Sequence, residues 1–336
     1  MLCGELGCEM WLGWWLACVN EQQLQSADRA PAPSPPLEAV AGDTGAPLLT
    51  TEVGTEPAAP LTWDCAALPE RPLSIELVDG AVATLDVAFD DAGYLYSYDG
   101  ASALVRMLRG NEPGLVTYDP QGAQQMDWAA DGRLVMANTA DGSLMAVDLG
   151  TGVGESIAVG ISYAWGVRVD DDGAVWSANG NLQRSDPATG RTQEMFNPLW
   201  ILSVFDWSPD GERLYVSGYT GGEVYALPLN ADGVPDGRIE RVGATPGTAH
   251  YGLGTDACGN LYLSESATSS IYRMTPTGDV TKLYEMAPPN VRGIPYGFEW
   301  GSGVGGWRAD ALYVTDAITQ SVTEVVIGVP SRSYQP

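Results

Sequence analysis

Positive charge is scarce in this chain of 336 residues. Lysine and arginine together number 16, against 43 aspartate and glutamate residues, which gives a formal net charge of -27 at pH 7. This imbalance excludes the usual electrostatic attraction to nucleic acids and to anionic lipids. We therefore expect no nucleic-acid partner, and contact with a membrane only through an N-terminal lipid anchor.

Several catalytic signatures are also missing. The chain holds one histidine, His250, and it has no nucleotide-binding glycine loop, no zinc-type Cys or His spacing and no Gly-x-Ser-x-Gly elbow. The sequence therefore gives no support for a nucleotide-binding enzyme, a zinc enzyme or a serine hydrolase with a nucleophile elbow. A hydrophobic content of 45% with 18% charged residues nevertheless describes a folded globular protein.

The N-terminal region differs from the rest of the chain. Residues 1–19 end in the apolar stretch WLGWWLACV, which is too short for a membrane span of about 20 residues but resembles the core of an export signal. No basic residue precedes Arg29, so the usual basic flank is missing, whereas Leu-Ala-Cys at 16–18 resembles a lipoprotein cleavage site with Cys18 as the lipidated residue. Residues 20–62 are rich in Pro and Ala and predict a disordered linker. We expect an extracytoplasmic protein, secreted, periplasmic or lipid-anchored.

One sequence pattern recurs six times in the remaining chain: a strand, a tight turn with Asp or Gly, and a second strand rich in Leu, Val, Tyr and Trp. Examples are MDWAADGRLVMANTADG and FDWSPDGERLYVSGYTGG, and the repeats begin 38 to 48 residues apart. A four-stranded propeller blade needs about 40 to 50 residues. The sequence therefore predicts an all-β, six-bladed propeller over residues 63–336.

The ends of the chain complete this ring. The sixth repeat lacks a fourth strand, whereas LSIELVDG at residues 73–80 precedes the first repeat without a partner. We expect this N-terminal strand to complete the last blade, which leaves no open edge. Cys65, just before it, and Cys258, in the first turn of the fifth repeat, are the two cysteines of the folded part. They predict a disulfide and an oxidising compartment, with two free thiols as the alternative.

The blades resemble a known family. LSVFDWSPDGERLYVSGYTGGEVYALPL and HYGLGTDACGNLYLSESATSSIYRMTPTG are similar to blades of the gluconolactonase and regucalcin (senescence marker protein) family, and more loosely to NHL-type repeats. The resemblance implies a divalent cation, often calcium, held by Glu, Asn and Asp at the mouth of the central channel, where it activates water for lactone hydrolysis.

The cation ligands implied by this resemblance are not retained. The matching positions hold no carboxylate, although a shift of the alignment by one residue would bring in Asp86 and Gln125. These positions are Leu85, Gln124, Trp165, Ser203, Tyr251 and Tyr296. Their aromatic side chains predict a concave surface for a sugar ring or a flat apolar ligand, with Gln124 and Ser203 as polar groups. The alternative is a plug that fills the centre of the ring.

A second ring of polar residues ends the second strands. Asp99, Glu265 and Asp316 come from adjacent blades and predict a rearranged cation site, unless they accept hydrogen bonds from their own loops. His250 and Glu265 are candidates for acid–base catalysis.

Three functions follow from these residues. The first is a binding module for a small ligand or a protein partner at the mouth. The second is a metal-dependent hydrolase of the lactonase type, and the third is a structural envelope module. Whether the protein is an enzyme is left open.

Overall fold

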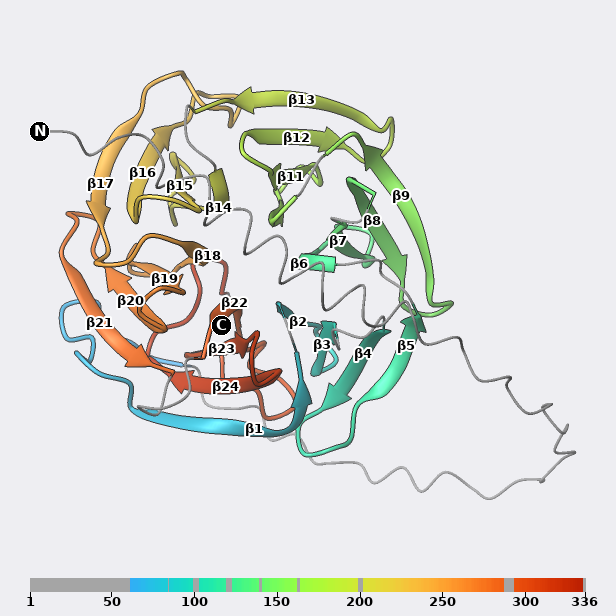
Figure 1. The fold of residues 1–336 in the computed structure, drawn as a ribbon, viewed down its shortest axis with the longest axis horizontal. Coiled ribbons are helices and arrows are strands. Elements are labelled where there is room, and N and C mark those ends of the chain that lie inside the picture. Colours follow the sequence, from blue (N-terminus) through green and yellow to red (C-terminus); the bar gives the residue numbers. More distant parts are fainter. Residues whose placement is uncertain are drawn as a thin grey trace, which may run out of the picture. The chain divides into compact units, whose positions relative to one another are not determined.

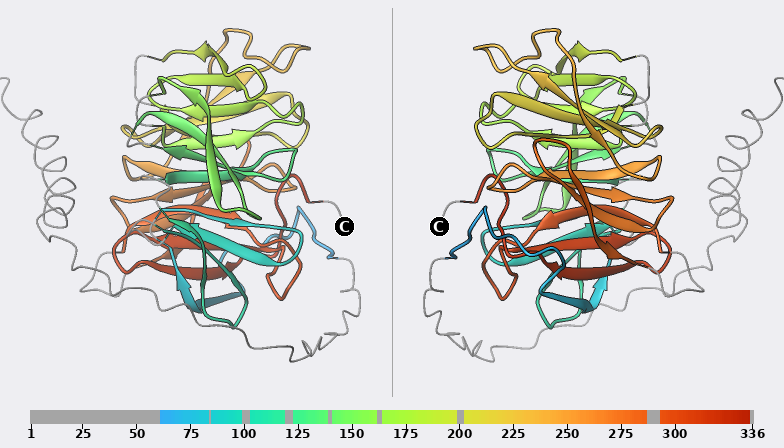
Figure 2. Two further views of the ribbon diagram at one scale, coloured as in Figure 1. Left: turned by 90° about the vertical axis from the view of Figure 1, so that its right-hand side faces the viewer. Right: turned by 90° about the vertical axis from the view of Figure 1, so that its left-hand side faces the viewer.

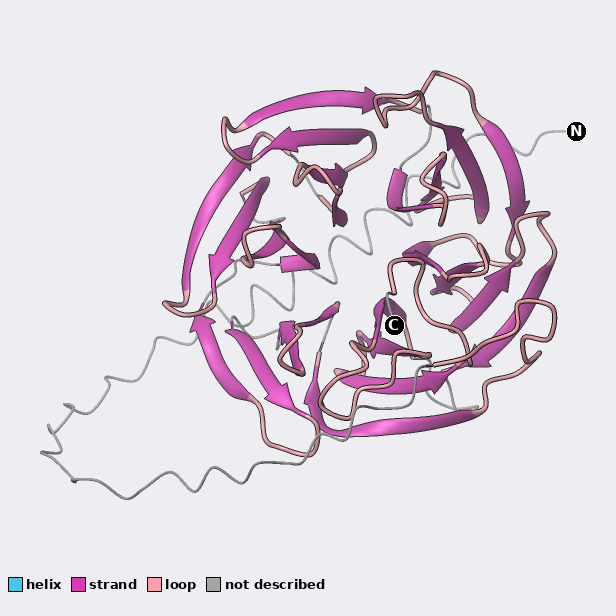
Figure 3. Cartoon of the chain, turned by 180° about the vertical axis from the view of Figure 1, so that it is seen from behind, coloured by secondary structure: helices cyan, strands magenta, loops and turns pink. Residues whose placement is uncertain are grey.

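The computed structural model describes residues 61–83, 85–98, 103–118, 123–138, 141–161, 164–198, 202–286 and 293–334. These residues form six four-stranded antiparallel sheets arranged around a central axis (Figure 1). Every regular element among them is a strand (Figure 3). The predicted six-bladed propeller is confirmed. The predicted leader with Cys18, and nearly all of the predicted linker, lie outside the described residues.

Five of the six blades run outward from the axis in chain order, and the outer strand of the sixth is β1. The innermost strands are β2 (Val87–Phe89), β6 (Ala123–Trp128), β10 (Gly166–Val169), β14 (Leu202–Trp207), β18 (His250–Thr255) and β22 (Pro295–Trp300). The second strands are β3 (Tyr94–Tyr98), β7 (Leu134–Asn138), β11 (Val175–Ala178), β15 (Arg213–Gly218), β19 (Leu261–Glu265) and β23 (Ala311–Asp316). The third strands are β4 (Ala103–Leu108), β8 (Ser143–Asp148), β12 (Leu182–Asp186), β16 (Glu223–Pro228), β20 (Ser270–Met274) and β24 (Ser321–Val326). The outer strands are β5 (Gly114–Tyr118), β9 (Val153–Val159), β13 (Arg191–Phe196), β17 (Glu240–Ala244), β21 (Val280–Glu285) and β1 (Ser74–Val82).

The ring closes through β1. This strand pairs antiparallel with β24, with Ser74 opposite Val326 and Leu77 opposite Thr323, so that it forms the outer strand of the sixth blade. Figure 2 shows the blades from the side. The predicted closure by the N-terminal strand is confirmed.

Aspartates at the first turn of three blades are used for turn formation. Asp90 Oδ1 accepts hydrogen bonds from the amides of Ala92 and Tyr94, and its Oδ2 accepts one from the hydroxyl of Tyr96. The same pattern, with an aromatic donor six residues after the aspartate, recurs at Asp170 with Trp176 and at Asp256 with Tyr262. Each aspartate thus fixes its turn and anchors a buried aromatic ring of the second strand.

Cys65 and Cys258 form the expected disulfide, with their Cα atoms 5.5 Å apart. The bond joins the segment before β1 to the turn between β18 and β19. In the same region the rings of Trp63 and Tyr334 pack edge to face at 6.2 Å, so residues from both ends of the described chain meet on the fifth and sixth blades. None of the described residues belongs to a helix long and apolar enough to cross a membrane.

Candidate functional site

The inner strands begin at one axial end of the ring, which we call the mouth. Four of them carry a β-bulge near this end, where the pairing with the second strand shifts by one residue. A bulge changes which side chains face inward. Gln124, Ser203, Tyr251 and Tyr296 all lie in these bulges, which explains why strict alternation does not describe the residues near the axis.

Four aromatic rings from consecutive blades form an arc at the mouth. The ring of Trp165 lies 5.2 Å from that of Tyr219, and Tyr219 lies 5.6 Å from Tyr251 in an edge-to-face arrangement. Tyr251 stacks on Tyr296 at 4.4 Å, and the Tyr296 hydroxyl donates to Gln124 Oε1 at 2.6 Å. This aromatic arc brings together Trp165, Tyr251 and Tyr296, three of the residues that the sequence offers as a ligand surface.

The arc is buried at one end and more open at the other. Tyr251 and Tyr296 are 5% and 8% exposed, whereas Trp165 and Tyr219 are half-buried. Burial raises the pKa of Tyr251 and of Tyr296, so that both hydroxyls stay protonated at neutral pH. The arc therefore presents neutral rings and hydroxyl groups, and its Trp165 and Tyr219 faces remain partly accessible.

Ser203 does not belong to the arc. Its hydroxyl donates to the backbone carbonyl of His250 at 2.9 Å, which ties the fourth blade to the fifth. Gln125, which follows the predicted Gln124, donates through Nε2 to the carbonyl of Tyr251 at 3.0 Å. Ser203 is thus engaged in blade packing, and the second and fifth blades are joined by Gln125.

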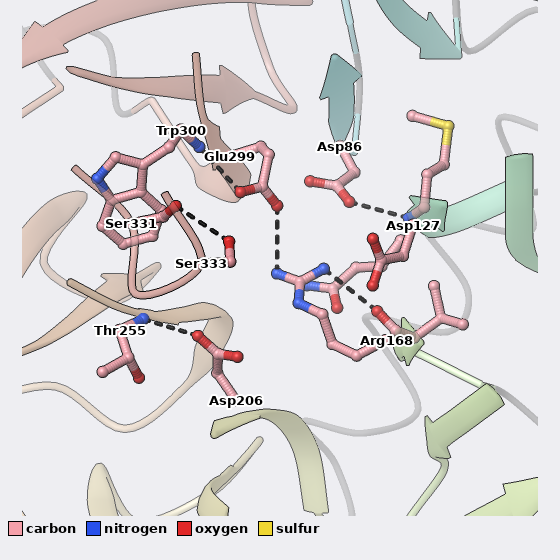
Figure 4. A network of polar contacts seen from close by, with 12 residues as sticks. Asp86, Asp127, Arg168, Asp206, Thr255, Glu299, Trp300, Ser331 and Ser333 are labelled. Atoms are coloured by element: carbon pink, nitrogen blue, oxygen red, sulfur yellow. Dashed lines mark hydrogen bonds and ion pairs between the residues drawn. The ribbon is translucent and has the colours of Figure 1, made fainter. Parts of the chain in front are cut away.

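A ring of charged side chains lies further along the axis, three residues after the mouth positions (Figure 4). Asp127, Arg168, Asp206 and Glu299 occupy equivalent places in four inner strands. Nη2 of Arg168 lies 3.7 Å from Oε2 of Glu299. Asp86 approaches this charged ring from the first blade, so one arginine faces four carboxyl groups.

Most of these carboxyl groups also connect neighbouring blades. Asp86 Oδ2 accepts from the amide of Met126 at 3.0 Å, and Asp127 Oδ2 accepts from the amide of Val169 at 2.8 Å. Asp206 Oδ2 accepts from the amide of Thr255 at 2.8 Å, as Figure 4 shows. The charged ring therefore ties inner strands together, in addition to any role in the site.

Burial dominates the electrostatics of this ring. It raises the pKa of Asp86 to about 8 and that of Glu299 to about 7, although the Arg168 guanidinium opposes both shifts. Burial also raises the pKa of Asp127. For Arg168 burial alone would lower the pKa, but the surrounding carboxylates, Glu299 foremost, raise it overall. Arg168 thus stays charged while Asp86 is mainly protonated at pH 7.

The C-terminal segment lies at the opposite end of the axis from the mouth. The backbone amide of Arg332 donates to the carbonyl of Thr255, and its Nε donates to Asp206 Oδ1, both at 2.9 Å. The guanidinium also lies over the ring of Trp207, 5.2 Å from its centroid. The segment therefore supplies a second cation to the charged ring, at Asp206.

The residues predicted for a cation site hold loops. Glu265 accepts hydrogen bonds from the amides of Thr248, Ala249, Ala267 and Thr268 and from the Thr268 hydroxyl. Burial alone would raise the pKa of Glu265, but these bonds lower it. Asp316 Oδ1 likewise accepts from the amides of Ile294 and Ile318. Asp99 lies outside the described residues, so the complete three-carboxylate site stays a prediction.

The cation implied by the family resemblance does not fit the residues present. Gln124 Oε1 already accepts the Tyr296 hydroxyl, and the Ser203 hydroxyl is donated to a carbonyl. Within the part of the chain that the structure describes, no three His, Cys, Asp or Glu side chains are grouped to hold a metal ion.

His250 is held as a neutral, buried side chain. Its Nδ1 contacts Ser217 Oγ, and its Nε2 lies 2.7 Å from Thr245 Oγ1. Because the Ser217 hydroxyl donates to the carbonyl of Glu223, its oxygen accepts the proton of Nδ1, and Nε2 accepts from Thr245. Burial lowers the pKa of His250 to about 4, with Glu265 opposing the shift. Both ring nitrogens are occupied by hydroxyl groups, and Glu265 is bonded to its loop.

Sequence reasoning missed Tyr219 and the charged ring. Tyr219 directly follows Gly218, the last residue of β15, and so lies one position beyond the strand end that the repeat pattern marks. The charged ring had a readable signal, since MDW, VRV, FDW and FEW place a charge between apolar residues at the same point of four repeats. A charge in a buried strand is rare unless it is paired.

Comparison with known proteins agrees with this architecture. Residues 166–318 match the family described as SMP-30/Gluconolactonase/LRE-like region. A search of curated proteins finds no match. Among solved structures, regucalcin from Agrobacterium tumefaciens, described as a calcium-binding protein, superposes with a TM-score of 0.64 at 18% identity, covering 79% of this chain and 97% of that one.

Two further structures share the fold. A gluconolactonase from Xanthomonas campestris has a TM-score of 0.62 at 16% identity, covering 81% of this chain and 94% of its own. An auxiliary nutrient binding protein from Bacteroides thetaiotaomicron has a TM-score of 0.59 at 13% identity, covering 79% and 74%. The match of residues 166–318 to the SMP-30/gluconolactonase/LRE-like family agrees with the resemblance of the blades to that family.

Proposed function

We propose that this propeller is a binding module that takes a small organic ligand at the aromatic arc. The observation that carries the proposal is the set of four rings, from Trp165 through Tyr219 and Tyr251 to Tyr296, which gather at one axial end with Gln124 beside them. Aromatic faces with a few fixed polar groups are typical of ligand sites. Leu85 packs against the same cluster and adds apolar surface.

Thermal unfolding of the full chain with a panel of neutral sugars, aromatic compounds and ammonium compounds tests this proposal. A ligand that binds only the folded state raises the midpoint. We expect at least one compound to raise it, and Trp165→Ala to abolish the shift. Tyr94→Leu is the matched control, because Tyr94 is also half-buried but begins β3, at the other end of the first blade.

The same experiment separates a site from a plug. A plug predicts that Trp165→Ala lowers the midpoint without changing any ligand shift. A protein partner on the mouth predicts that no small compound shifts the midpoint, while a complex forms that Trp165→Ala weakens. Either result would count against the small-ligand proposal.

A lactonase is the alternative that the family name favours. We expect no rise of the midpoint when excess calcium, manganese or zinc replaces EDTA, because the mouth oxygens are already hydrogen-bonded. A rise of several degrees with one cation would revive the hydrolase and direct attention to Glu265 and Asp316.

Export from the cytoplasm also belongs to the proposal. The Cys65–Cys258 disulfide supports an oxidising compartment. Fractionation of cells that produce the full chain, with and without Cys18→Ser, tests it. A protein found in the cytoplasm with both thiols reduced would contradict export.

A further inference from the structure

The aromatic arc has the composition of a cation-binding surface. Its four rings come from four consecutive blades, and the rings of Trp165 and Tyr219 remain partly accessible. The faces of tryptophan and tyrosine rings carry partial negative charge and attract cations, including quaternary ammonium groups. Because burial keeps the hydroxyls of Tyr251 and Tyr296 protonated, the attraction comes from ring faces and not from phenolates.

Carboxyl groups lie along the axis below the arc. Asp86 is 2% exposed, and its Oδ1 has no hydrogen-bond partner among the described residues. Above its pKa of about 8 it is ionised, and its charge is close enough to Tyr296 to act on that hydroxyl. Figure 4 shows Asp86 in the same view as Glu299, with Arg168 between the acidic side chains. Arg168 faces four carboxyl groups, and Arg332 pairs with one of them, Asp206. Above about pH 8, where Asp86 and Glu299 are both ionised, this part of the molecule is therefore short of positive charge.

The free oxygen of Asp86 is not placed as a direct acceptor for an N–H donor. It lies against Gly297, 2.3 Å from the point where a Cβ would stand. A ligand ammonium group would therefore be held by the rings, with Asp86 acting through space. This geometry favours a cation that has no N–H groups.

We infer that the ligand of the mouth carries a quaternary ammonium group, which lies against the aromatic arc above the carboxyl groups of the axis. The inference rests on the proposed ligand site and names the chemical class of its ligand. Nothing in it requires a metal ion or a chemical reaction.

Isothermal titration of the full chain at pH 9, where Asp86 is ionised, with choline and with 3,3-dimethyl-1-butanol tests the inference. The two compounds have the same shape, but only choline is charged. We expect choline to bind at least about tenfold more tightly, a difference of about 1.4 kcal/mol. Equal binding of the two compounds, or tighter binding of the alcohol, would overturn the inference.

Two variants separate the contributions of the carboxyl group and the rings. Asp86→Asn should weaken choline and leave the alcohol unchanged, whereas Tyr219→Leu should weaken both. Asp171→Asn is the control, because it removes one negative charge from an exposed turn. Loss of choline binding in Asp171→Asn to the same degree would show that only net charge matters, and would overturn the role of Asp86.

The salt dependence of the unaltered protein gives an independent readout if Asp86→Asn does not fold. Choline affinity should fall between about 10 and about 300 mM salt, while the affinity of the alcohol stays constant. If neither probe binds but a neutral sugar raises the midpoint through Trp165, the ammonium inference fails and the proposed site stands. If no compound depends on Trp165, both fail.

Discussion

Removal of the single arginine in the charged ring is the most informative perturbation of the fold. In Arg168→Met the methionine side chain takes the place of the apolar stem of the arginine, but the guanidinium group is lost. It faces four carboxyl groups, those of Glu299, Asp127, Asp206 and Asp86. Breaking a buried ion pair costs about 3–5 kcal/mol. Because the Glu299 side chain keeps 32% of its surface exposed, we expect the lower end, about 3 kcal/mol.

The assay is thermal unfolding at two pH values. A loss of about 3 kcal/mol corresponds to roughly 5 °C in a domain of about 270 residues, for an unfolding entropy of about 2.1 cal/mol/K per residue. The pKa of Asp86 is about 8 and that of Glu299 about 7, so at pH 6 both carry protons and need the arginine less. We expect a larger loss at pH 9 than at pH 6, and partial recovery in Arg168→Met combined with Glu299→Gln.

The two raised pKa values also predict how the stability of the unaltered protein changes with pH. A carboxyl group whose folded-state pKa is raised stabilises the fold fully below its ordinary pKa, and this stabilisation is lost as the pH rises through the folded value. Asp86 and Glu299 therefore favour the folded state near pH 4 and cease to do so near pH 8. The control is Arg133→Met, which removes the surface pairs with Asp131 and Glu155 and should cost less than about 1 kcal/mol. An Arg168→Met loss that is absent, or equal at both pH values, would refute this reasoning.

Three further predictions concern other parts of the propeller. Cys258→Ser should lower stability by about 2–5 kcal/mol, because the disulfide spans 193 residues, and an unfolding midpoint that is unchanged by reductant would contradict this. The pKa of His250 is about 4, so its ring should take up no proton above about pH 5 in an NMR titration, and a titration midpoint near 6.5 would contradict this. Because the unfolded chain takes up that proton near pH 6.5, the free energy of unfolding should fall by about 3 kcal/mol as the pH drops to 4. Gly297→Ala should cost about 1–3 kcal/mol by chemical denaturation, because its Cβ would stand 2.3 Å from Asp86 Oδ1, whereas Gly114→Ala, with its nearest neighbouring atom at 3.8 Å, should cost less; equal losses would show that the close approach does not matter.

The ring could be predicted from the sequence because its blades repeat the same local chemistry. The turn aspartates and the alternating strands recur from blade to blade, so each repeat predicts the same structure. The outer strand that the sixth repeat lacks is supplied by the unpartnered strand before the first repeat. The disulfide followed from the same register, since it places Cys65 beside the first turn of the fifth blade.

The site was only partly predictable, for a reason that lies in the inner strands. Period-two alternation predicts that a residue at the mouth and the residue three positions later face opposite sides of a sheet. Each bulge at the mouth inserts one residue. Tyr296 and Glu299 therefore face the same side of their strand, and so do Gln124 and Asp127. Bulges leave little trace in sequence composition, so period-two alternation did not connect the charges of MDW, VRV, FDW and FEW with the residues of the mouth.

The most direct test of the central claim is the binding isotherm of the most stabilising panel compound, recorded in EDTA for the unaltered full chain and for Tyr251→Leu. We predict that the unaltered protein binds without any divalent cation, and that the variant, which loses the ring between Tyr219 and Tyr296, binds at least about tenfold more weakly. Binding that appears only when calcium is added, or that is the same in both proteins, would contradict a cation-independent site at the aromatic arc.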